Sequence, residues 1–276
     1  MATSNNSLTY QMANAAAVAS ALIVNMLANV LPFNGVTTGQ VSDSYPNLFT
    51  PPGYVFSIWG VIYALGIVFM VYQVRPSQRK ETYLSQIGFL YLFGAVANIS
   101  WLLVFHYSYG LPQLFVFSLV PMAVLLICLL SIYQRLGIGM REAPRNLKLT
   151  VHLSISVYLG WISLAIIANI ASVLNVLFPG IPEPTQALWT AMVIVVALLI
   201  SSFMVLTRRD FAFGLVVIWA SIGIALNRSA MSPIFASSII TVGIVALLIL
   251  LAPFLMKTGF VDFYMSRGNP GKLTRL

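Results

Sequence analysis

Long apolar stretches alternate with short polar segments along the whole chain. An α-helix rises 1.5 Å per residue, so about 20 apolar residues cross the roughly 30 Å of hydrocarbon in a bilayer. Most of the stretches reach that length, and the pattern therefore predicts an all-α integral membrane protein with about eight transmembrane helices. The stretches are residues 12–33, 52–74, 83–106, 111–134, 149–178, 186–206, 211–227 and 234–256.

The basic residues are divided unevenly between the connections. If every stretch crosses the membrane, 13 of the 14 Lys and Arg residues lie on one face, and only Arg228 lies on the other. Basic loops stay in the cytoplasm, so both termini are predicted to be cytoplasmic. We interpret Arg228 as a cation whose long side chain reaches the membrane interface. A bacterial plasma membrane is favoured, because the N-terminal residues do not resemble an Arg-rich transit peptide.

The composition supports the same class of protein. Hydrophobic residues make up 59% of the chain and charged residues only 7%, whereas soluble domains carry about 25% charge. The net charge of +8 is spread over short loops and the C-terminal tail, so the expected partner is the lipid bilayer, and nucleic acid is not expected. A single cysteine, Cys128, excludes a disulfide within the chain and a Cys-based metal site.

Polar residues at membrane depth give no catalytic or metal-binding pattern. We find no nucleophile elbow, phosphate-binding loop or pair of carboxylates, and we predict no catalytic residue. The lack of an acidic residue deep in any stretch disfavours ion pumping. His106 and His152 lie near the ends of different stretches, on opposite faces, so no metal site is predicted. Axial ligation of a tetrapyrrole metal by one of these histidines stays open.

Aromatic residues recur at helical spacing inside the stretches. Phe56, Trp59 and Tyr63 stand at i, i+3 and i+7 and share one helix face. Asn98, Trp101 and Phe105 repeat that spacing in the third stretch, and all five tryptophans fall within stretches. Buried indoles suit a planar hydrophobic ligand, although aromatics that only pack helices together produce the same pattern.

Three ordered motifs resemble the translocator protein family (TspO/MBR), also called tryptophan-rich sensory proteins. Residues 51–63 read PPGYVFSIWGVIY, residues 97–106 read ANISWLLVFH, and residues 157–169 read VYLGWISLAIIAN. Two departures are Phe49, where that family has a tryptophan, and Ile99, which replaces one tryptophan of its WxW motif. The resemblance covers roughly residues 10–178, and the last three stretches have no counterpart in that five-helix family.

The resemblance implies a TspO-like five-helix bundle at residues 10–178. Three additional transmembrane helices at 179–258 and a basic cytoplasmic tail at 259–276 would follow it. The implied function is that of a membrane receptor or carrier, regulatory or sensory, for a planar hydrophobic ligand such as a porphyrin or another tetrapyrrole, with residues 34–51 as a lid. Asn98 and Asn169 would supply hydrogen bonds, and the implied ligand-binding residues are Phe56, Trp59, Tyr63, Asn98, Trp101, Phe105, Tyr158, Trp161 and Asn169.

Other functions stay open at this point. Some members of that family have been proposed to degrade porphyrins photochemically, which would make the protein an enzyme without an acid-base pair. Eight stretches also suit a small-molecule transporter. The last three stretches would instead provide a docking face if the protein is an accessory or structural subunit of a membrane complex. Homo-oligomer formation is equally open.

Overall fold

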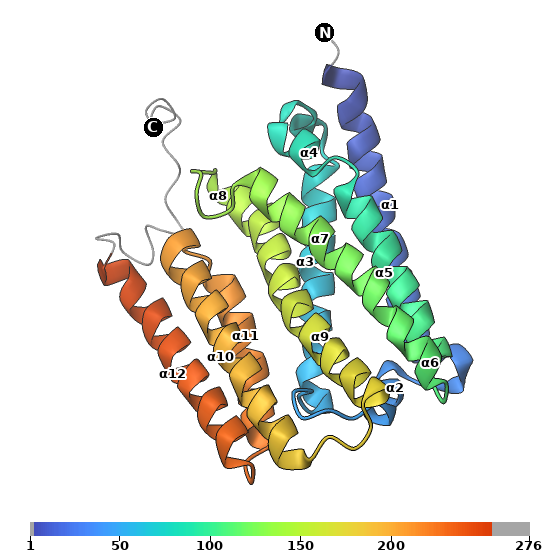
Figure 1. Ribbon diagram of the computed structural model, residues 1–276. Coiled ribbons are helices and arrows are strands. Elements are labelled where there is room, and N and C mark those ends of the chain that lie inside the picture. The colour runs from blue at the N-terminus through green and yellow to red at the C-terminus, as the bar shows by residue number, and fades with distance from the viewer. Residues whose placement is uncertain (1–2, 256–276) are drawn as a thin grey trace.

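The computed structural model describes residues 3–255, which form helices, turns and short connections without a strand. Seven helical segments are long and apolar enough to cross a membrane, and α11, with 17 residues, is a shorter apolar helix beside them. The predicted all-α integral membrane protein is therefore confirmed (Figure 1). The long helices are α1 (Thr3–Val30), α3 (Ile58–Gln73), α5 (Leu90–Tyr107), α7 (Leu119–Leu136), α9 (Leu153–Leu177), α10 (Glu183–Arg208), α11 (Phe211–Asn227) and α12 (Ser232–Leu255).

Short helical elements join the long helices at both ends of the molecule. The first connection contains η1 (Phe33–Gly35) and α2 (Thr38–Ser44), and a capping box between Thr37 and Gln40 begins α2. The remaining short elements are η2 (Gly53–Ser57), η3 (Pro76–Lys80), α4 (Thr82–Ile87), α6 (Pro112–Phe115), η4 (Val116–Ser118), α8 (Arg145–Leu147) and the π-helical turn η5 (Lys148–His152).

The third apolar stretch, expected to be one helix over residues 83–106, is broken into α4 and α5. Gly88 separates them with φ +55° and ψ −132°, a backbone conformation that L side chains rarely adopt. Its amide still donates to the Leu84 carbonyl, so α4 ends normally before the chain turns. The membrane-crossing part is therefore α5 alone, with 18 residues.

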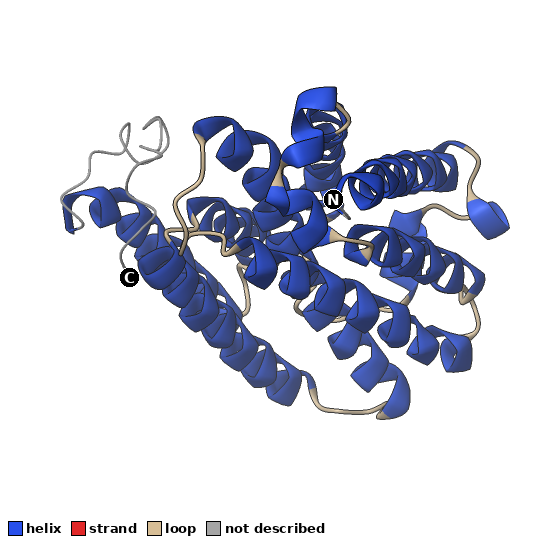
Figure 2. Ribbon diagram, turned by 90° about the horizontal axis from the view of Figure 1, so that it is seen from above, coloured by secondary structure: helices blue, strands red, loops and turns tan. Residues whose placement is uncertain are grey.

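Five helices close into a ring. In order around the ring, α3 packs on α1, α1 on α5, α5 on α7, α7 on α9, and α9 on α3 again. Figure 2 shows the helices from above. The other three helices form a second unit, in which α12 packs on both α10 and α11. The two units are joined because α11 also packs along α9. The predicted division near residue 178 falls between α9 and α10 and stays a prediction, and the tail at 259–276 lies outside the described residues.

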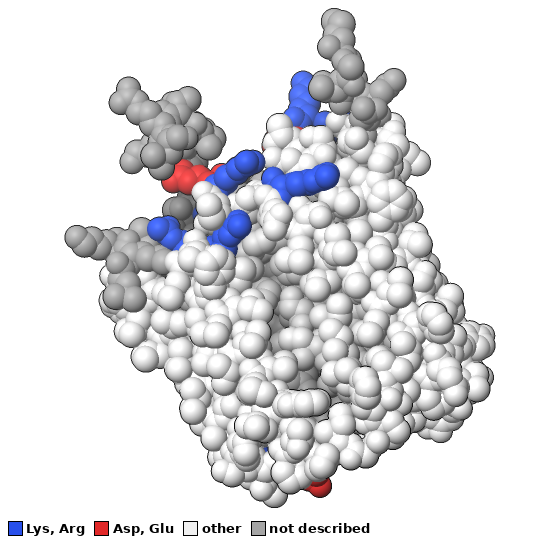
Figure 3. Space-filling view, in the orientation of Figure 1, with Lys and Arg blue, Asp and Glu red and all other residues white. Residues whose placement is uncertain are grey.

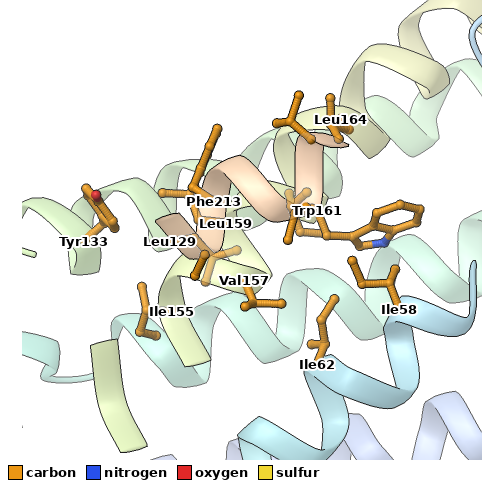
Figure 4. Close-up of a cluster of buried hydrophobic side chains, with 14 of the residues drawn as sticks. Ile58, Ile62, Leu129, Tyr133, Ile155, Val157, Leu159, Trp161, Leu164 and Phe213 are labelled. Atoms are coloured by element: carbon orange, nitrogen blue, oxygen red, sulfur yellow. The ribbon is translucent and has the colours of Figure 1, made fainter. Parts of the chain in front are cut away.

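Gly160 lets α9 and α11 approach each other closely. A Cβ atom at Gly160 would lie 3.2 Å from Val216 Cβ, so the two helices are in tight contact there. Close approach of this kind matters in lipid, where no hydrophobic driving force pulls helices together. One buried cluster consequently runs from Ile58 and Ile62 in α3, through Trp161 in α9, to Phe213 in α11 (Figure 4). The last three helices thus share their core with the ring.

Lys and Arg side chains gather at the end of the molecule where α4 and α8 lie (Figures 1 and 3). Arg228 is at the opposite end, directly after α11. The middle of the molecule presents apolar side chains to its surroundings, as a multi-pass protein in contact with the lipid bilayer does. The separation of charge follows the predicted arrangement of loops, while the orientation of the two faces in the cell stays a prediction. Four of the basic residues assigned to the predicted cytoplasmic face, Lys257, Arg267, Lys272 and Arg275, lie outside the described residues.

Candidate functional site

A cavity lies inside the ring at the end that holds α2, and we call it the outer cavity. It provides about 720 Å³ of space between side chains, part of which is open to solvent. Residues of the first connection, among them Thr38, Tyr45 and Phe49, form one wall. Six of the nine predicted ligand-binding residues line the remainder: Phe56, Trp59, Trp101, Phe105, Trp161 and Asn169.

A second cavity, the inner cavity, lies next to it between α1, α3, α5, α7 and α9. It provides about 500 Å³ of space, again partly open. The other three predicted residues, Tyr63, Asn98 and Tyr158, line it. Trp59 lines both cavities and so forms part of the wall between them. The structure therefore brings all nine residues to two adjoining cavities in the ring.

The aromatic side chains lie against one another around these cavities. Trp59 stacks on Tyr63 with ring centroids 5.6 Å apart, and it meets Trp161 edge to face at 6.2 Å. On the other side of the outer cavity, Trp101 stacks on Phe105 at 4.8 Å. These distances fall within the range at which aromatic pairs attract each other beyond simple burial. Three helices of the ring thus contribute flat apolar walls.

Three buried donors at the cavities have no acceptor within the described residues. They are Trp101 Nε1, Trp161 Nε1 and Asn98 Nδ2. Both indoles are at least nine-tenths buried, and the Asn98 side chain is 1% exposed. A buried donor without a partner is unfavourable, so each of these groups would gain from an acceptor on a bound molecule.

The two predicted asparagines differ in their surroundings. Asn98 accepts a hydrogen bond from Asn25 Nδ2 at 2.7 Å through its carbonyl oxygen, which leaves its amide nitrogen as the unpartnered group. Asn169 instead pairs with Ser118, whose Oγ lies 2.8 Å from the Asn169 amide nitrogen and 3.0 Å from its carbonyl oxygen. The Asn169 side chain thus fixes α9 against the segment before α7.

The first connection is folded tightly over the outer cavity. Asn47 Oδ1 accepts from the backbone N–H groups of Phe49 and Thr50 at 2.9 and 2.7 Å, which closes a turn. The Asn47 amide also donates to Ser172 Oγ in α9 at 2.7 Å. Tyr45 stacks on Phe115 and donates its hydroxyl hydrogen to the Ser108 carbonyl, and burial raises the pKa of this phenol above its usual value. The segment from Tyr45 to Thr50, which is the last part of the expected lid at residues 34–51, is therefore ordered as a cover, and we call this segment alone the lid.

Sequence reasoning missed the part that α11 plays in the site. Ala220 and Ile224 of α11 line the outer cavity. Trp219 Nε1 donates to the Val55 carbonyl at 3.0 Å, which ties α11 to the start of the second membrane segment. These three residues lie in an apolar helix. In the sequence, only the tryptophan could have indicated a part in the site.

Arg228 was expected to reach the membrane interface, and its contacts show a role in the fold beyond that interpretation. Its Nη2 donates to the Asn47 carbonyl at 2.9 Å, and its Nε donates to the Leu48 carbonyl at 3.3 Å. The guanidinium therefore holds the lid through its backbone. A signal existed, because Arg228 is the only basic residue assigned to that face, but its partner lies about 180 positions earlier.

The histidines lie at opposite ends of the ring. Nδ1 of His106, at the end of α5, lies 2.9 Å from the Leu102 carbonyl oxygen, and its Nε2 lies 3.4 Å from Thr38 Oγ1. His152 is in η5, at the beginning of α9. Among residues 3–255, no three His, Cys, Asp or Glu side chains come together as a group that could hold a metal ion.

Comparison with known proteins gives one finding. A family model described as TSPO-like protein matches residues 11–253, so the match runs through the ring and continues into α12. No curated protein and no solved structure matches the chain.

Proposed function

The chain belongs to the family of TSPO-like proteins, and on that premise we propose that it is a membrane receptor or carrier for a planar hydrophobic ligand, such as a porphyrin or another tetrapyrrole. The ligand would occupy the outer cavity and reach toward the inner cavity past Trp59. The proposal is carried by one observation: five predicted aromatic side chains line the same cavity beneath the lid. They are Phe56, Trp59, Trp101, Phe105 and Trp161.

The chemistry of the cavity supports this class of ligand. Pockets for small molecules and cofactors are mostly apolar, with a few polar groups that orient the ligand. The outer cavity has such a lining, with aromatic and aliphatic side chains and the polar groups of Thr38 and Asn169. Flat aromatic walls favour a flat ligand, because stacking adds to the gain from burial. Carboxylate or carbonyl oxygens on the ligand would accept hydrogen bonds from the Trp101 and Trp161 indoles after a small rotation of these rings.

The lid would control how fast the ligand enters and leaves the outer cavity. Tyr45, Phe49 and Thr50 of the lid line the outer cavity, so movement of the lid would widen the path for binding and release. Its backbone is fixed by Asn47 and by Arg228, and release should therefore be slow compared with that from an open groove. Slow release suits a receptor or a carrier that must keep a reactive pigment away from lipid.

Protoporphyrin IX titration of the purified protein tests the proposal. We expect saturable quenching of tryptophan fluorescence. Trp101→Leu or Trp161→Leu should weaken binding by about 1–3 kcal/mol, or about 5- to 150-fold, because each removes an aromatic wall of the cavity. Trp189→Leu is the matched control, because Trp189 lies in α10 and does not line the outer or the inner cavity. The helicity of each variant is measured first by circular dichroism.

The pattern across the three variants decides the outcome. Equal losses for all three would mean that porphyrin partitions nonspecifically or that the variants are unfolded, and the site would have to be abandoned. Absence of saturation in the wild-type protein would refute the proposed ligand class.

A further inference from the structure

A third cavity lies outside the ring, between the lid, α9 and α10, and we call it the seam cavity. It provides about 740 Å³ of space, part of it open to the surroundings. None of the nine predicted ligand-binding residues lines it. Its walls are built from both units of the molecule, with Ile170 and Leu174 from α9 and Trp189 and Val193 from α10.

The seam cavity changes in polarity along its length. Asn175 and Gln186 line it near the end of α9 and the start of α10, at the same end of the molecule as the lid. Val193 lines it seven residues further along α10, which corresponds to about 10 Å along the helix axis. The cavity is therefore more polar at the end beside the lid, while the residues further along α10 are apolar except for Thr190.

The amides at the polar end are held in position. Asn175 Nδ2 donates to the Pro46 carbonyl at 3.0 Å and to Gln186 Oε1 at 3.3 Å. Gln186 Nε2 donates to the Ile181 carbonyl at 2.8 Å, a bond that uses one of its two amide hydrogens. These side chains offer hydrogen bonds at a defined place. The lining includes no Asp, Glu, Lys, Arg or His, so it offers no ion pair to a charged head group.

The outer wall of the seam cavity borders lipid. Trp189 is 46% exposed, and its neighbours Leu188 and Met192 on α10 are also exposed apolar residues of a membrane-crossing segment. On the other side, Phe49 is 3% exposed and lines both the seam cavity and the outer cavity. A molecule that approached from the bilayer beside α10 would therefore meet the seam cavity before it met the outer cavity.

We propose that the seam cavity is a second binding site, for a membrane-dissolved amphiphile with a neutral hydrogen-bonding head and an extended apolar body. The head binds beside Asn175 and Gln186, and the body lies along Ile170, Trp189 and Val193. This site is separate from the proposed porphyrin site and does not depend on it. Phe49 is the side chain that divides the two.

Photolabelling tests this site directly. The probe is a monoacylglycerol with a diazirine in its acyl chain, added to full-length protein in lipid nanodiscs, and labelled peptides are identified by mass spectrometry. We expect label in α9 and α10, reduced by excess unlabelled monoacylglycerol. Val193→Phe fills the cavity and should lower this labelling at least about five-fold, because the probe would clash with the new phenyl group. Val196→Phe is the matched control, because Val196 is a lipid-exposed residue of the same helix and lies outside the cavity lining.

Further arms keep the proposal open to refutation. Ile170→Phe fills the same space from α9 and replaces Val193→Phe if that variant does not fold. An alkyl sulfate carrying the same diazirine should label α9 and α10 less than the neutral probe, and equal labelling would refute the neutral head. Labelling that resists competition, or that both filling variants leave unchanged, would mean surface contact with lipid and would overturn the site. Protoporphyrin IX affinity should not change in Val193→Phe. The outcome of this test is therefore independent of the proposed function.

Discussion

Asp210 illustrates how much one residue contributes at the junction of the two units. It stands between α10 and α11, is 5% exposed, and accepts a hydrogen bond from the Phe213 backbone N–H at 3.0 Å. The carboxylate therefore caps the beginning of α11, where backbone donors have no partner within the helix. Burial raises the pKa of the Asp210 carboxyl above its usual value. The same side chain thus supplies a cap and carries a cost when it is ionised.

Two substitutions separate these effects. Asp210→Ala should lower the free energy of unfolding by about 1 kcal/mol, because it removes the cap. Asp210→Asn should retain the cap and its contribution to stability, because asparagine caps helices well. Since the folded-state pKa is raised, the folded protein binds this proton more tightly than the unfolded chain. The wild type should therefore lose stability as pH rises from about 4 through the raised value, and Asp210→Asn should lack this loss. Thermal unfolding in detergent between pH 4 and 8 measures both effects, and identical pH profiles for wild type and Asp210→Asn would contradict the interpretation.

At the scale of single residues, helical spacing decides which side chains share a face. The stripes through Trp59 and Trp101 both line cavities, while their part in ligand binding stays a prediction. The partners of those side chains were not predictable. Asn169 was expected to face a ligand, but its pairing with Ser118 depends on how α9 meets the segment before α7, 51 residues away.

At the scale of elements, α11 and the lid form one assembly. A Cβ atom at Gly223 would lie 2.3 Å from Val55 Cγ2 and 3.3 Å from Pro51 Cβ, so this part of α11 touches the chain directly after the lid. Trp219 and Arg228 donate to backbone carbonyls on either side of that contact. The helix therefore holds the cover of the outer cavity in place, although it belongs to the second unit.

Gly223→Ala tests this coupling. Val55 is completely buried and has little room to move, so the added methyl group should force α11 and the lid apart at a cost of about 1–3 kcal/mol. We expect faster hydrogen exchange of the backbone amides of Phe49 and Thr50, measured by mass spectrometry. Gly243→Ala in α12 is the matched control, because a Cβ there meets nothing within 4 Å, and it should leave lid exchange unchanged. Unchanged exchange in both variants would separate the lid from α11.

Element boundaries were predictable from hydropathy, but their arrangement was not. Apolar length identified the long helices, while the break at Gly88 required the backbone geometry of one glycine. Helices in lipid carry apolar residues on nearly all faces, so periodicity does not show which of them become neighbours. The packing of α11 on α9, and its share of the outer cavity, therefore appeared only in three dimensions.

At the scale of the whole molecule, the basic residues are unevenly distributed. Counting apolar stretches placed nearly all basic residues on one face, and the described Lys and Arg side chains other than Arg228 gather at one end of the structure (Figure 3). The family match, which covers residues 11–253, treats the ring and most of the second unit as one continuous region. A threading with both termini on the basic face agrees with the distribution of charge, and the orientation in the cell stays a prediction.

Cysteine labelling decides the orientation. Cys128, the only cysteine, is buried in α7, so Cys128→Ala gives a background without reactive thiols. Asp43→Cys in the first connection and Glu142→Cys near α8 are both exposed positions, and α3, α5 and α7 lie between them. An impermeant maleimide should label Asp43→Cys in intact cells and Glu142→Cys only after permeabilisation, because basic loops are retained in the cytoplasm.

The remaining labelling patterns each have a definite meaning. Both positions should react after permeabilisation, which controls for access. The reverse pattern in intact cells would invert the protein and place the basic face outside. Labelling of both positions without permeabilisation would require an even number of crossings between residues 43 and 142, so one of α3, α5 and α7 would not span the membrane. That result would also open the ring, since all three helices are needed to close it, and the outer and inner cavities would lose walls that carry Trp59 and Trp101.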